Sequence, residues 1–354
     1  MIYNLSFMIF ASISLGINIL ITPILIKTAH RYSWFDEVNQ RTIHTGEIPR
    51  IGGIGIVFSF FITVFLYIIY NRIYLSPSNF FQSIFHYLPV LLGALIINLL
   101  GLLDDFTDLR AKYKLIIQLL AALLIVCSGK YFIGFYIPGI HYSIHLDIIA
   151  KVFTVLWIIG ITNAVNLIDG MDGLSSGTTE IILFFMGLSA VYSGDYSQAL
   201  LIFILFGSVL GFMFFNFPPA KLFMGDSGSL FLGFFLACMP LYSSYNNAHG
   251  LTLIVSVSFL FIPILDTIAA IIRRIRKGIP FYSPDKNHLH HSLLKLGLST
   301  KQILLIVYSA TLILSLFAYL FIKTENMIIF YGTLGLWIMM ICLFILLSYK
   351  TKNR

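Results

Sequence analysis

The amino-acid sequence predicts an all-α protein that crosses a membrane many times, and three observations support this fold class. Hydrophobic residues make up 58% of the 354 residues and charged residues only 10%, whereas about a quarter of a soluble domain is charged. Apolar runs of bilayer-spanning length recur along the whole chain. Lys and Arg residues gather in alternate loops between these runs. The sequence shows no internal repeat, and we therefore treat residues 1–354 as a single domain.

About eleven apolar runs are predicted to form membrane-spanning helices. No basic residue precedes the first run, residues 5–26, so we interpret it as a retained helix with its N-terminus outside and not as a cleaved signal peptide. Residues 130–146 alternate loosely around Pro138-Gly139, which predicts a short hairpin outside the membrane. The other runs lie near residues 51–70, 84–103, 113–128, 147–168, 173–193, 196–216, 229–246, 250–272, 302–322 and 327–348.

The distribution of positive charge predicts the orientation of the bundle. With the N-terminus outside, the outside loops hold only Arg72, Lys130, Lys151 and Lys323, and the other Lys and Arg residues lie inside. This bias places the C-terminus and a basic face in the cytoplasm. Such a face suits anionic lipid headgroups and a polyanionic soluble substrate, and nucleic-acid binding is not needed to explain it.

Acidic residues form a first cluster directly after the third apolar run, where Asp104 and Asp105 are followed by Asp108. Adjacent carboxylates repel each other unless a cation or a shared proton relieves them, which favours Mg²⁺ binding or a proton-accepting role. A helix-terminal acidic turn explains this pair equally well. Lys114 is either a counter-charge or phosphate contact for this cluster, or a lysine whose stem runs along lipid.

The second cluster is the sequence NAVNLIDGMDGL, residues 163–174. Asn163, Asn166 and Asp169 share one face of a helix. The Asp-Gly pairs that begin at Asp169 and Asp172 break this helix at the membrane surface. Asparagines in an apolar helix can instead join it to other helices, but the density of polar groups here favours a binding site.

The third cluster is the sequence FMGDSGS, residues 223–229. Glycines on both sides of Asp226 allow a tight turn, and free backbone amides at the start of the next helix suit a phosphate. An ordinary helix cap by Asp226 or Ser227 is the alternative. Charged groups at a membrane edge are costly unless they are paired or bind ions, and all three clusters fall at inside ends of helices. We therefore expect them to form one active site on the cytoplasmic face.

The longest inside loop, residues 273–301, is basic and rich in histidine. It begins with Arg273 and Arg274 and contains the sequence PDKNHLHH, residues 284–291. Its three histidines could bind a transition metal or, when protonated, donate to phosphate oxygens. Because the sequence has no second cluster of Cys or His, a structural zinc site is disfavoured.

In this order, the Asp-Asp pair, NAVNLIDGMDGL, FMGDSGS and HLHH resemble the motifs of the polyprenyl-phosphate N-acetylhexosamine-1-phosphate transferase superfamily. The sequence IPRIGG, residues 48–53, resembles the first cytoplasmic loop of that family, and the similarity extends over residues 44–291. The family includes enzymes that start enterobacterial common antigen, O-antigen and wall teichoic acid synthesis, and the phospho-MurNAc-pentapeptide translocase. Asp108 and the arginine-rich stretch before HLHH favour the GlcNAc-1-phosphate branch over the MurNAc-pentapeptide branch. A relative specific for GalNAc or a deoxy-aminosugar is an alternative.

The resemblance implies an enzyme of the bacterial inner membrane that transfers GlcNAc-1-phosphate from UDP-GlcNAc to undecaprenyl phosphate and releases UMP. It implies Mg²⁺, with Mn²⁺ as a substitute, bound by Asp226 and Asp105. Asp104 or Asp105 would be the catalytic base, with Asp104 preferred, and a two-step route through an aspartyl-phosphate is the rival mechanism. The resemblance also allows a homodimer, which is common among relatives.

Further site residues are implied by the same resemblance. The implied catalytic histidines are His288, His290 and His291. Together with Arg273 and Arg274, they would close over the sugar phosphate as cationic donors. The implied substrate-binding residues are Arg50, Lys114, Asn163, Asn166, Asp169, Asp172, Phe223, Arg273 and Arg274.

A transporter is the alternative class of protein. Transporters also have many spans with internal carboxylates, but their polar groups lie near the bilayer midplane and often repeat in two halves. Here only Glu180 and Asp266 are acids placed well inside predicted spans. The other acidic clusters lie at one face without a repeat, so the sequence favours an enzyme.

Overall fold

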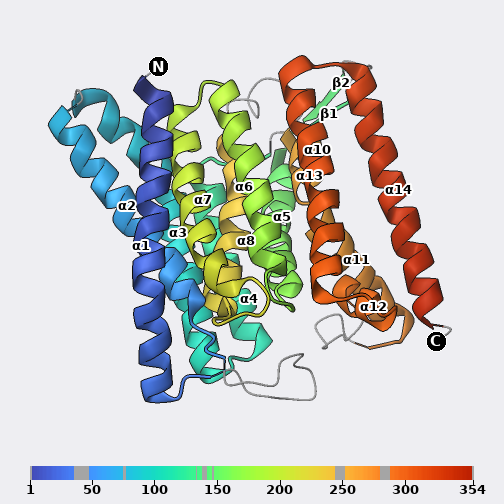
Figure 1. Cartoon of the computed structure of the whole chain (residues 1–354). Helices are drawn as coiled ribbons and strands as arrows, with labels where there is room; N and C mark the ends of the chain where they lie inside the picture. Colours follow the sequence, from blue (N-terminus) through green and yellow to red (C-terminus); the bar gives the residue numbers. More distant parts are fainter. Residues whose placement is uncertain are drawn as a thin grey trace.

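The computed structural model describes residues 2–35, 48–74, 77–132, 134–137, 142–145, 147–243, 252–279 and 288–352. Within these ranges the chain forms a bundle of long helices that run between the two ends of the molecule, and one short β-hairpin (Figure 1). The all-α prediction is therefore confirmed for the bundle. The first eight helices are α1 (Ile2–Tyr32), α2 (Gly52–Tyr74), α3 (Pro77–Thr107), α4 (Ala111–Cys127), α5 (Asp147–Ile168), α6 (Leu174–Tyr192), α7 (Tyr196–Asn216) and α8 (Gly225–Tyr242). They are followed by α10 (Thr252–Phe259), α11 (Phe261–Arg276), α12 (Leu289–Lys295), α13 (Thr300–Thr324) and α14 (Met327–Lys352).

Every apolar run predicted from the sequence overlaps a helix of the structure. Among the described residues, eight helices are long and apolar enough to cross a membrane, or nine if the bent pair α10 and α11 is one span. These two helices meet at Leu260 at an angle of 83°. Pro263 lies in the first turn of α11 and has no N–H to donate to the carbonyl of Phe259, so the helical hydrogen bonding is interrupted here. The protein is thus a polytopic membrane protein, as predicted.

The predicted hairpin is confirmed. Strands β1 (Gly134–Ile137) and β2 (Tyr142–His145) pair antiparallel, with Gly134 opposite His145 and Ile137 opposite Tyr142. The predicted turn at Pro138-Gly139 lies outside the described residues. The hairpin and the N-terminus lie at one end of the bundle, and α12 and the C-terminus lie at the other end (Figure 1).

Helix α8 lies inside the bundle and packs against α2, α3 and α5. All of its residues are buried, including Phe231, Phe234 and Phe235. In contrast, the outward faces of helices such as α4, α5 and α13 expose large apolar side chains, among them Leu120, Ile149 and Leu305. Apolar surface of this extent is typical of contact with lipid.

Two glycines allow the N-terminus of α8 to lie close to its neighbours. A Cβ atom added to Gly53, at the start of α2, would lie 2.2 Å from the backbone nitrogen of Gly228. A Cβ atom added to Gly101, near the end of α3, would lie 2.4 Å from the carbonyl oxygen of Asp226. Both distances are shorter than real Cβ atoms show, so glycine is required at both positions. The close approach brings Asp226 next to the acidic end of α3.

Candidate active site at one end of the bundle

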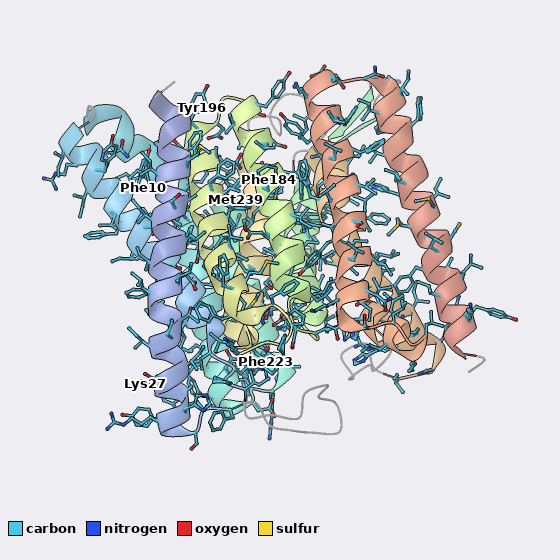
Figure 2. All side chains as sticks on the ribbon, in the orientation of Figure 1. Phe10, Lys27, Phe184, Tyr196, Phe223 and Met239 are labelled. Atoms are coloured by element: carbon cyan, nitrogen blue, oxygen red, sulfur yellow. The ribbon has the colours of Figure 1, made fainter. Side chains whose placement is uncertain are left out.

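Three of the four sequence motifs meet where α3 and α5 end and α8 begins. Phe223, which precedes α8, lies toward the lower end of the bundle, as does Lys27, whereas Met239 and Tyr196 lie toward the upper end (Figure 2). The carboxylates of Asp104, Asp105 and Asp226 gather at this lower end, and the hydrogen bonds described below connect them. The prediction that separate clusters form one site is supported by these contacts.

Asp105 caps α8 from another helix. Its carboxylate accepts hydrogen bonds from the backbone nitrogens of Asp226, at 2.7 Å, and Ser227, at 3.0 Å. The first amides of a helix have no partner within the helix, and α8 has no side-chain cap from its own N-cap residue, Met224. Asp105 therefore fixes the start of α8, and with it the position of Asp226.

Asp226 lies between two cations. Its Oδ1 atom accepts hydrogen bonds from Nη2 of Arg50, at 2.7 Å, and from Nδ2 of Asn166, at 3.1 Å. Its Oδ2 atom accepts one from Nζ of Lys114, at 3.3 Å. A buried carboxylate needs such partners because its desolvation is costly.

Lys114 joins two carboxylates. Its Nζ atom contacts Oδ2 of Asp104 as well as Oδ2 of Asp226. The other oxygen of Asp104 accepts a hydrogen bond from the backbone nitrogen of Leu109, at 2.8 Å. A single positive charge is thus shared by carboxylates from α3 and α8, which explains how two like charges can lie so close together.

This arrangement fits a divalent cation that takes part of its ligands from a substrate. Mg²⁺ is usually bound by one or two carboxylates, substrate phosphates and water. Asp104 and Asp226 supply two carboxylates around one cation, here the Lys114 ammonium. Among the residues that the structure describes, no three His, Cys, Asp or Glu side chains converge to hold a metal by themselves. Both oxygens of Asp105, the other predicted ligand, accept hydrogen bonds from backbone amides.

The backbone of residues 49–53 positions Arg50. The nitrogen of Phe223 donates to the carbonyl oxygen of Pro49, at 2.8 Å, and the carbonyl oxygen of Phe223 accepts from the nitrogen of Gly52, at 2.8 Å. These bonds join the segment of residues 48–53 to the segment before α8. Arg50 then reaches Asp226 and also lies 3.6 Å from Asp105, measured from Nε to Oδ1. The predicted site residue Phe223 therefore acts at least through its backbone.

The residues of the second motif fall into two groups. Asn166 reaches into the site, since its Nδ2 atom donates to Oγ of Ser229, at 2.9 Å, as well as to Asp226. Asp169 follows the end of α5. Burial is the main cause that raises the pKa of Asp169 to about 7, and Arg50 opposes this rise while Asp226 adds to it. These influences place Asp169 beside the charged groups.

The other two residues of the motif hold the surrounding structure. Oδ2 of Asp172 accepts a hydrogen bond from the nitrogen of Ala220, at 3.0 Å, and thereby fastens the loop before α8. Nδ2 of Asn163 donates to Oε1 of Gln118, at 2.7 Å, and joins α5 to α4. The sequence left two roles open for the asparagines, substrate binding and the joining of helices. For Asn163 the structure shows a contact that joins helices.

The histidine motif contacts the second motif. His290 is buried, its ring centroid lies 4.2 Å from that of His291, and its ring lies against Gly170, where an added Cβ atom would be 2.7 Å from Cε1. Burial, together with the neighbouring His291, lowers the pKa of His290 to about 3. This shift favours a neutral His290 ring because burial removes the ring from water, whereas the predicted role as a cationic donor requires a protonated ring.

The basic end of the loop is described only in part. Arg273 and Arg274 lie in the last turn of α11, with Arg274 buried. Residues 280–287 follow, and the predicted motif residues Asp285 and Lys286 among them lie outside the described residues. His288 begins the described chain again and is followed by α12.

Three contacts of the site were not predicted as site residues. Ser229 and Gln118 bind asparagines of the second motif, and Asp266 on α11 binds His288. Asp266 could have been identified from the sequence, because burying an ionisable residue within an apolar run costs free energy unless the residue has a polar partner. Ser229 is the last residue of the motif FMGDSGS, whereas nothing in the sequence distinguishes Gln118 from an ordinary helix residue.

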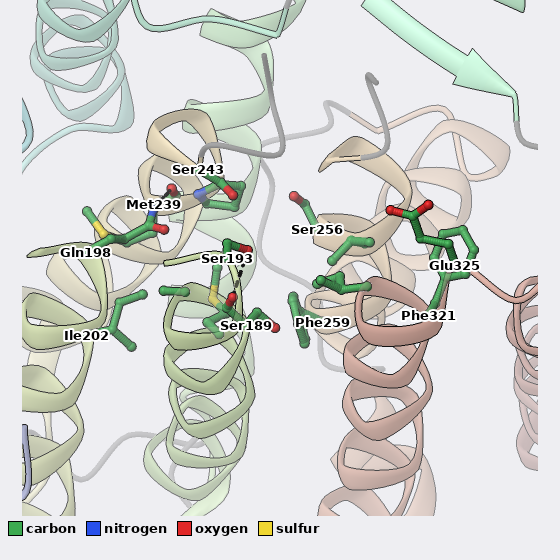
Figure 3. Close-up of a pocket in the computed structure, with 15 residues that line it drawn as sticks. Ser189, Ser193, Gln198, Ile202, Met239, Ser243, Ser256, Phe259, Phe321 and Glu325 are labelled. Atoms are coloured by element: carbon green, nitrogen blue, oxygen red, sulfur yellow. Dashed lines mark hydrogen bonds between the residues drawn. The ribbon is translucent and has the colours of Figure 1, made fainter. Parts of the chain in front are cut away.

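A separate cavity lies away from these motifs. It lies between α6, α7, α8, α10 and α13, and Ser189, Gln198, Met239 and Phe259 line it (Figure 3). Met239 belongs to the upper end of the bundle, opposite the carboxylates (Figure 2). No predicted site residue lines this cavity.

The fold and the site together define a polytopic membrane protein with a charged site, suited to phosphate groups, at one end of its bundle. Residues 87–244 match the family described as glycosyl transferase family 4. The chain is 38% identical over 306 residues to a probable undecaprenyl-phosphate N-acetylglucosaminyl 1-phosphate transferase of Bacillus subtilis (strain 168), which covers 86% of this chain and 82% of the relative. The chain belongs to this glycosyl transferase family.

Two further relatives extend the comparison. A decaprenyl-phosphate N-acetylglucosaminephosphotransferase of Mycobacterium tuberculosis (strain ATCC 25618 / H37Rv) is 34% identical over 290 residues, which are 76% of this chain and 71% of the relative. An undecaprenyl-phosphate alpha-N-acetylglucosaminyl 1-phosphate transferase of Escherichia coli (strain K12) is 28% identical over 299 residues, which are 82% of this chain and 77% of the relative.

Proposed function

We propose that this protein transfers N-acetylglucosamine-1-phosphate from UDP-N-acetylglucosamine to undecaprenyl phosphate and releases UMP. The observation that carries this proposal is the arrangement of Asp104, Lys114, Asp226 and Arg50, in which two carboxylates and two cations alternate at the end of the bundle. Such a site can bind anionic phosphates and a divalent cation at once. The sugar and the polyprenyl acceptor are proposed from the names of the relatives.

The proposed topology follows from the same bundle. We propose that α4 and α8 cross the membrane together with the other predicted helices, which makes eleven spans. Helix α4 has 17 residues, just short of a full span, and α8 is shielded from lipid by its neighbours. The bias of Lys and Arg supports a cytoplasmic site and C-terminus, with the N-terminus and hairpin outside. Since the relatives are bacterial, we assign the protein to the bacterial plasma membrane.

In the proposed mechanism the chain first neutralises and aligns the two phosphate substrates. Arg50 and Lys114 exchange part of their contacts with Asp226 for oxygens of the UDP-sugar diphosphate. Asn166 and Asp169 contact the uridine-diphosphate end. Mg²⁺, or Mn²⁺ in its place, would be held by Asp226, which lies beside Asp104, and would neutralise negative charge on the leaving UMP.

The transfer itself needs only alignment and one proton acceptor. Asp104 accepts the proton of the lipid phosphate, and the freed oxygen attacks the β-phosphorus in line. The new P–O bond forms while the bond from the β-phosphorus to the bridging oxygen breaks, and that oxygen leaves with UMP. We favour this direct route over an aspartyl-phosphate on Asp105, because both oxygens of Asp105 accept hydrogen bonds from backbone amides.

The remaining predicted residues have proposed roles around this centre. His288 and His291, with Arg273 and Arg274, approach the sugar phosphate, and neutral His290 supports the loop at Gly170. Asn163 and Asp172 hold the helices and loops that shape the site. Phe223 positions Arg50 through its backbone.

Radiolabelled donor transfer tests the proposal. Purified protein is incubated with undecaprenyl phosphate and labelled UDP-GlcNAc, UDP-GalNAc or UDP-MurNAc-pentapeptide, with Mg²⁺ or with EDTA. We expect labelled lipid and an equal amount of UMP with UDP-GlcNAc and Mg²⁺ only. Transfer solely from another donor would correct the sugar and leave the mechanism in place. A folded sample that transfers from no donor would contradict the proposed function.

A further inference from the structure

Asp266 and His288 form a buried pair beside the site. Oδ2 of Asp266 lies 2.8 Å from Nδ1 of His288, and Oδ1 of Asp266 accepts a hydrogen bond from the backbone nitrogen of Leu289, also at 2.8 Å. The Asp266 side chain is 2% exposed and that of His288 is 7% exposed. Asp266 lies on α11 and His288 lies 22 residues later, directly before α12, so the pair joins α11 to the start of α12.

The Asp266 carboxylate takes the place of a local helix cap. His288 is the N-cap residue of α12, but its own side chain caps no backbone amide. The amide of Leu289 is satisfied by Asp266 instead. One carboxylate therefore holds both the ring of His288 and the backbone amide of the next residue, Leu289.

We propose that Asp266 is a positioning residue that fixes the tautomer and the ring orientation of His288 for the transfer reaction; this inference rests on the proposed function. An ionised carboxylate can only accept hydrogen bonds, so Nδ1 of His288 must carry a proton to donate to it. The Nε2 atom is then the ring nitrogen left for a substrate oxygen or proton.

The neighbouring rings connect this pair to the carboxylate site. The rings of His288 and His290 are nearly parallel, at 5°, with their centroids 6.1 Å apart. His290 in turn lies against Gly170, next to Asp169. A change in the orientation of the His288 ring would therefore alter the packing of the His290 ring, and through it the position of Gly170 in the second motif.

Replacement of Asp266 by Asn gives a specific expectation. Asn has one accepting oxygen and one donating nitrogen, whereas two donors face this side chain. If the Asn oxygen serves Leu289, its nitrogen donates to Nδ1, and the proton of His288 moves to Nε2. We expect kcat to fall by about 10²-fold or more, and the KM for UDP-GlcNAc to change by less than about threefold.

A double-mutant cycle tests whether Asp266 acts through His288. Transfer is measured for wild type, Asp266→Asn, His288→Ala and the double variant. We expect the double variant to be no slower than His288→Ala, since residues that act as a unit are not additive. Additive losses would overturn the proposal. Thr267→Ala is the matched control, because this hydroxyl is the adjacent buried polar group on α11 and has no hydrogen-bond partner among the described residues; it should leave kcat unchanged.

A spectroscopic measurement makes the test independent of activity. ¹⁵N signals of the histidine rings, assigned to His288 by comparison with His288→Ala, report which nitrogen carries the proton. We expect Nδ1–H in the wild type and in Asp266→Glu, which keeps the carboxylate, and Nε2–H in Asp266→Asn. An Nε2–H tautomer in the wild type or in Asp266→Glu would overturn the proposal, even if Asp266→Asn did not fold.

The two readouts separate this inference from the proposed function. If the wild type transfers no sugar phosphate, the proposed function fails, while the tautomer still reports whether Asp266 sets the ring. If the wild type is active but the losses are additive, only the role of Asp266 fails.

Discussion

At the scale of single residues, three carboxylates of the same type differ because of what binds them. Asp105 meets two backbone amides, Asp226 meets two cations and an amide group, and Asp104 shares Lys114 with Asp226. Under the proposed function, Asp105 contributes chiefly to the structure of the site, whereas Asp226 and Asp104 lie next to the phosphates and the cation.

Because of this difference, we expect Asp105→Asn to lose more thermal stability than Asp226→Asn, and Asp226→Asn to lose activity with less effect on melting. Asp105→Asn leaves one buried amide of α8 without an acceptor, which costs about 1–3 kcal/mol, and should lower both the melting temperature and kcat. Asp226→Asn removes a charge aimed at substrates and should lower kcat by about 10²-fold or more, with a smaller change in melting. Thermal melting and UMP release check the pair, and a larger melting loss for Asp226→Asn would contradict these roles.

Lys114 allows a prediction about metal. In Lys114→Gln the carboxylates of Asp104 and Asp226 lose the positive charge between them and repel each other. We expect this variant to melt at a lower temperature than the wild type in EDTA, and to gain more from added Mg²⁺, because the ion then replaces the missing charge. Lys112→Gln is the control, since the Lys112 ammonium lies over the ring of Tyr113 instead. An equal gain from Mg²⁺ in the Lys114 variant and the wild type would argue against a metal at these carboxylates.

At the scale of helices, the site depends on how closely α8 approaches α2 and α3. Gly53 and Gly101 lie at these contacts, and a larger residue at either position would hold the helices further apart. The bend between α10 and α11 also brings polar residues to the site. After the bend, α11 runs toward the same end of the bundle and carries Asp266, Arg273 and Arg274.

Gly101→Ala tests the approach of α3 to α8. The added methyl group would meet the backbone of Asp226 and Ser227, which cannot move without displacing the start of α8. We expect a loss of about 1–3 kcal/mol in stability, and a fall in kcat because Asp226 moves away from Asp104. Gly16→Ala is the control, because nothing lies within 4 Å of a Cβ atom added there. Equal stability and activity of the two variants would contradict the close-contact argument.

At the scale of the whole molecule, the bias of positive charge and the lipid-facing surface are the basis of the proposed orientation. The proposed topology places the hairpin end outside and the carboxylate end in the cytoplasm, where a soluble nucleotide-sugar is available. Under the proposed function, the lipid acceptor reaches the same end from within the membrane. A site at a bundle end thus lies within reach of both a soluble and a membrane-bound substrate.

Cysteine labelling checks this orientation. Cys127, Cys238 and Cys342 are replaced by Ala, and a single cysteine is introduced at Asn326, between α13 and α14, or at Lys277, both of which are exposed. A membrane-impermeant maleimide should label Asn326→Cys in intact cells, and Lys277→Cys only after the membrane is opened. The reverse pattern would place the site outside and refute the proposed topology.

Much of the fold and part of the site could be predicted from local sequence. Helices were predicted correctly because an apolar run of bilayer length must satisfy its own backbone hydrogen bonds. The hairpin around Pro138-Gly139 was predicted from alternation and turn residues. The polar clusters at helix ends indicated a common site because charges at a membrane edge need partners.

The sequence by itself determined a helical membrane bundle with acidic motifs collected at one end, since composition and the period of apolar residues are local properties. Only the tertiary structure decided which side chain binds which partner. In the structure, Asp105 caps α8, Asn163 binds Gln118, and Asp266 accepts a hydrogen bond beside His288. Each of these contacts joins residues of different helices, and hydrogen bonds act over about 3 Å. Their choice of partner therefore depends on how the helices pack, which no spacing along the chain specifies.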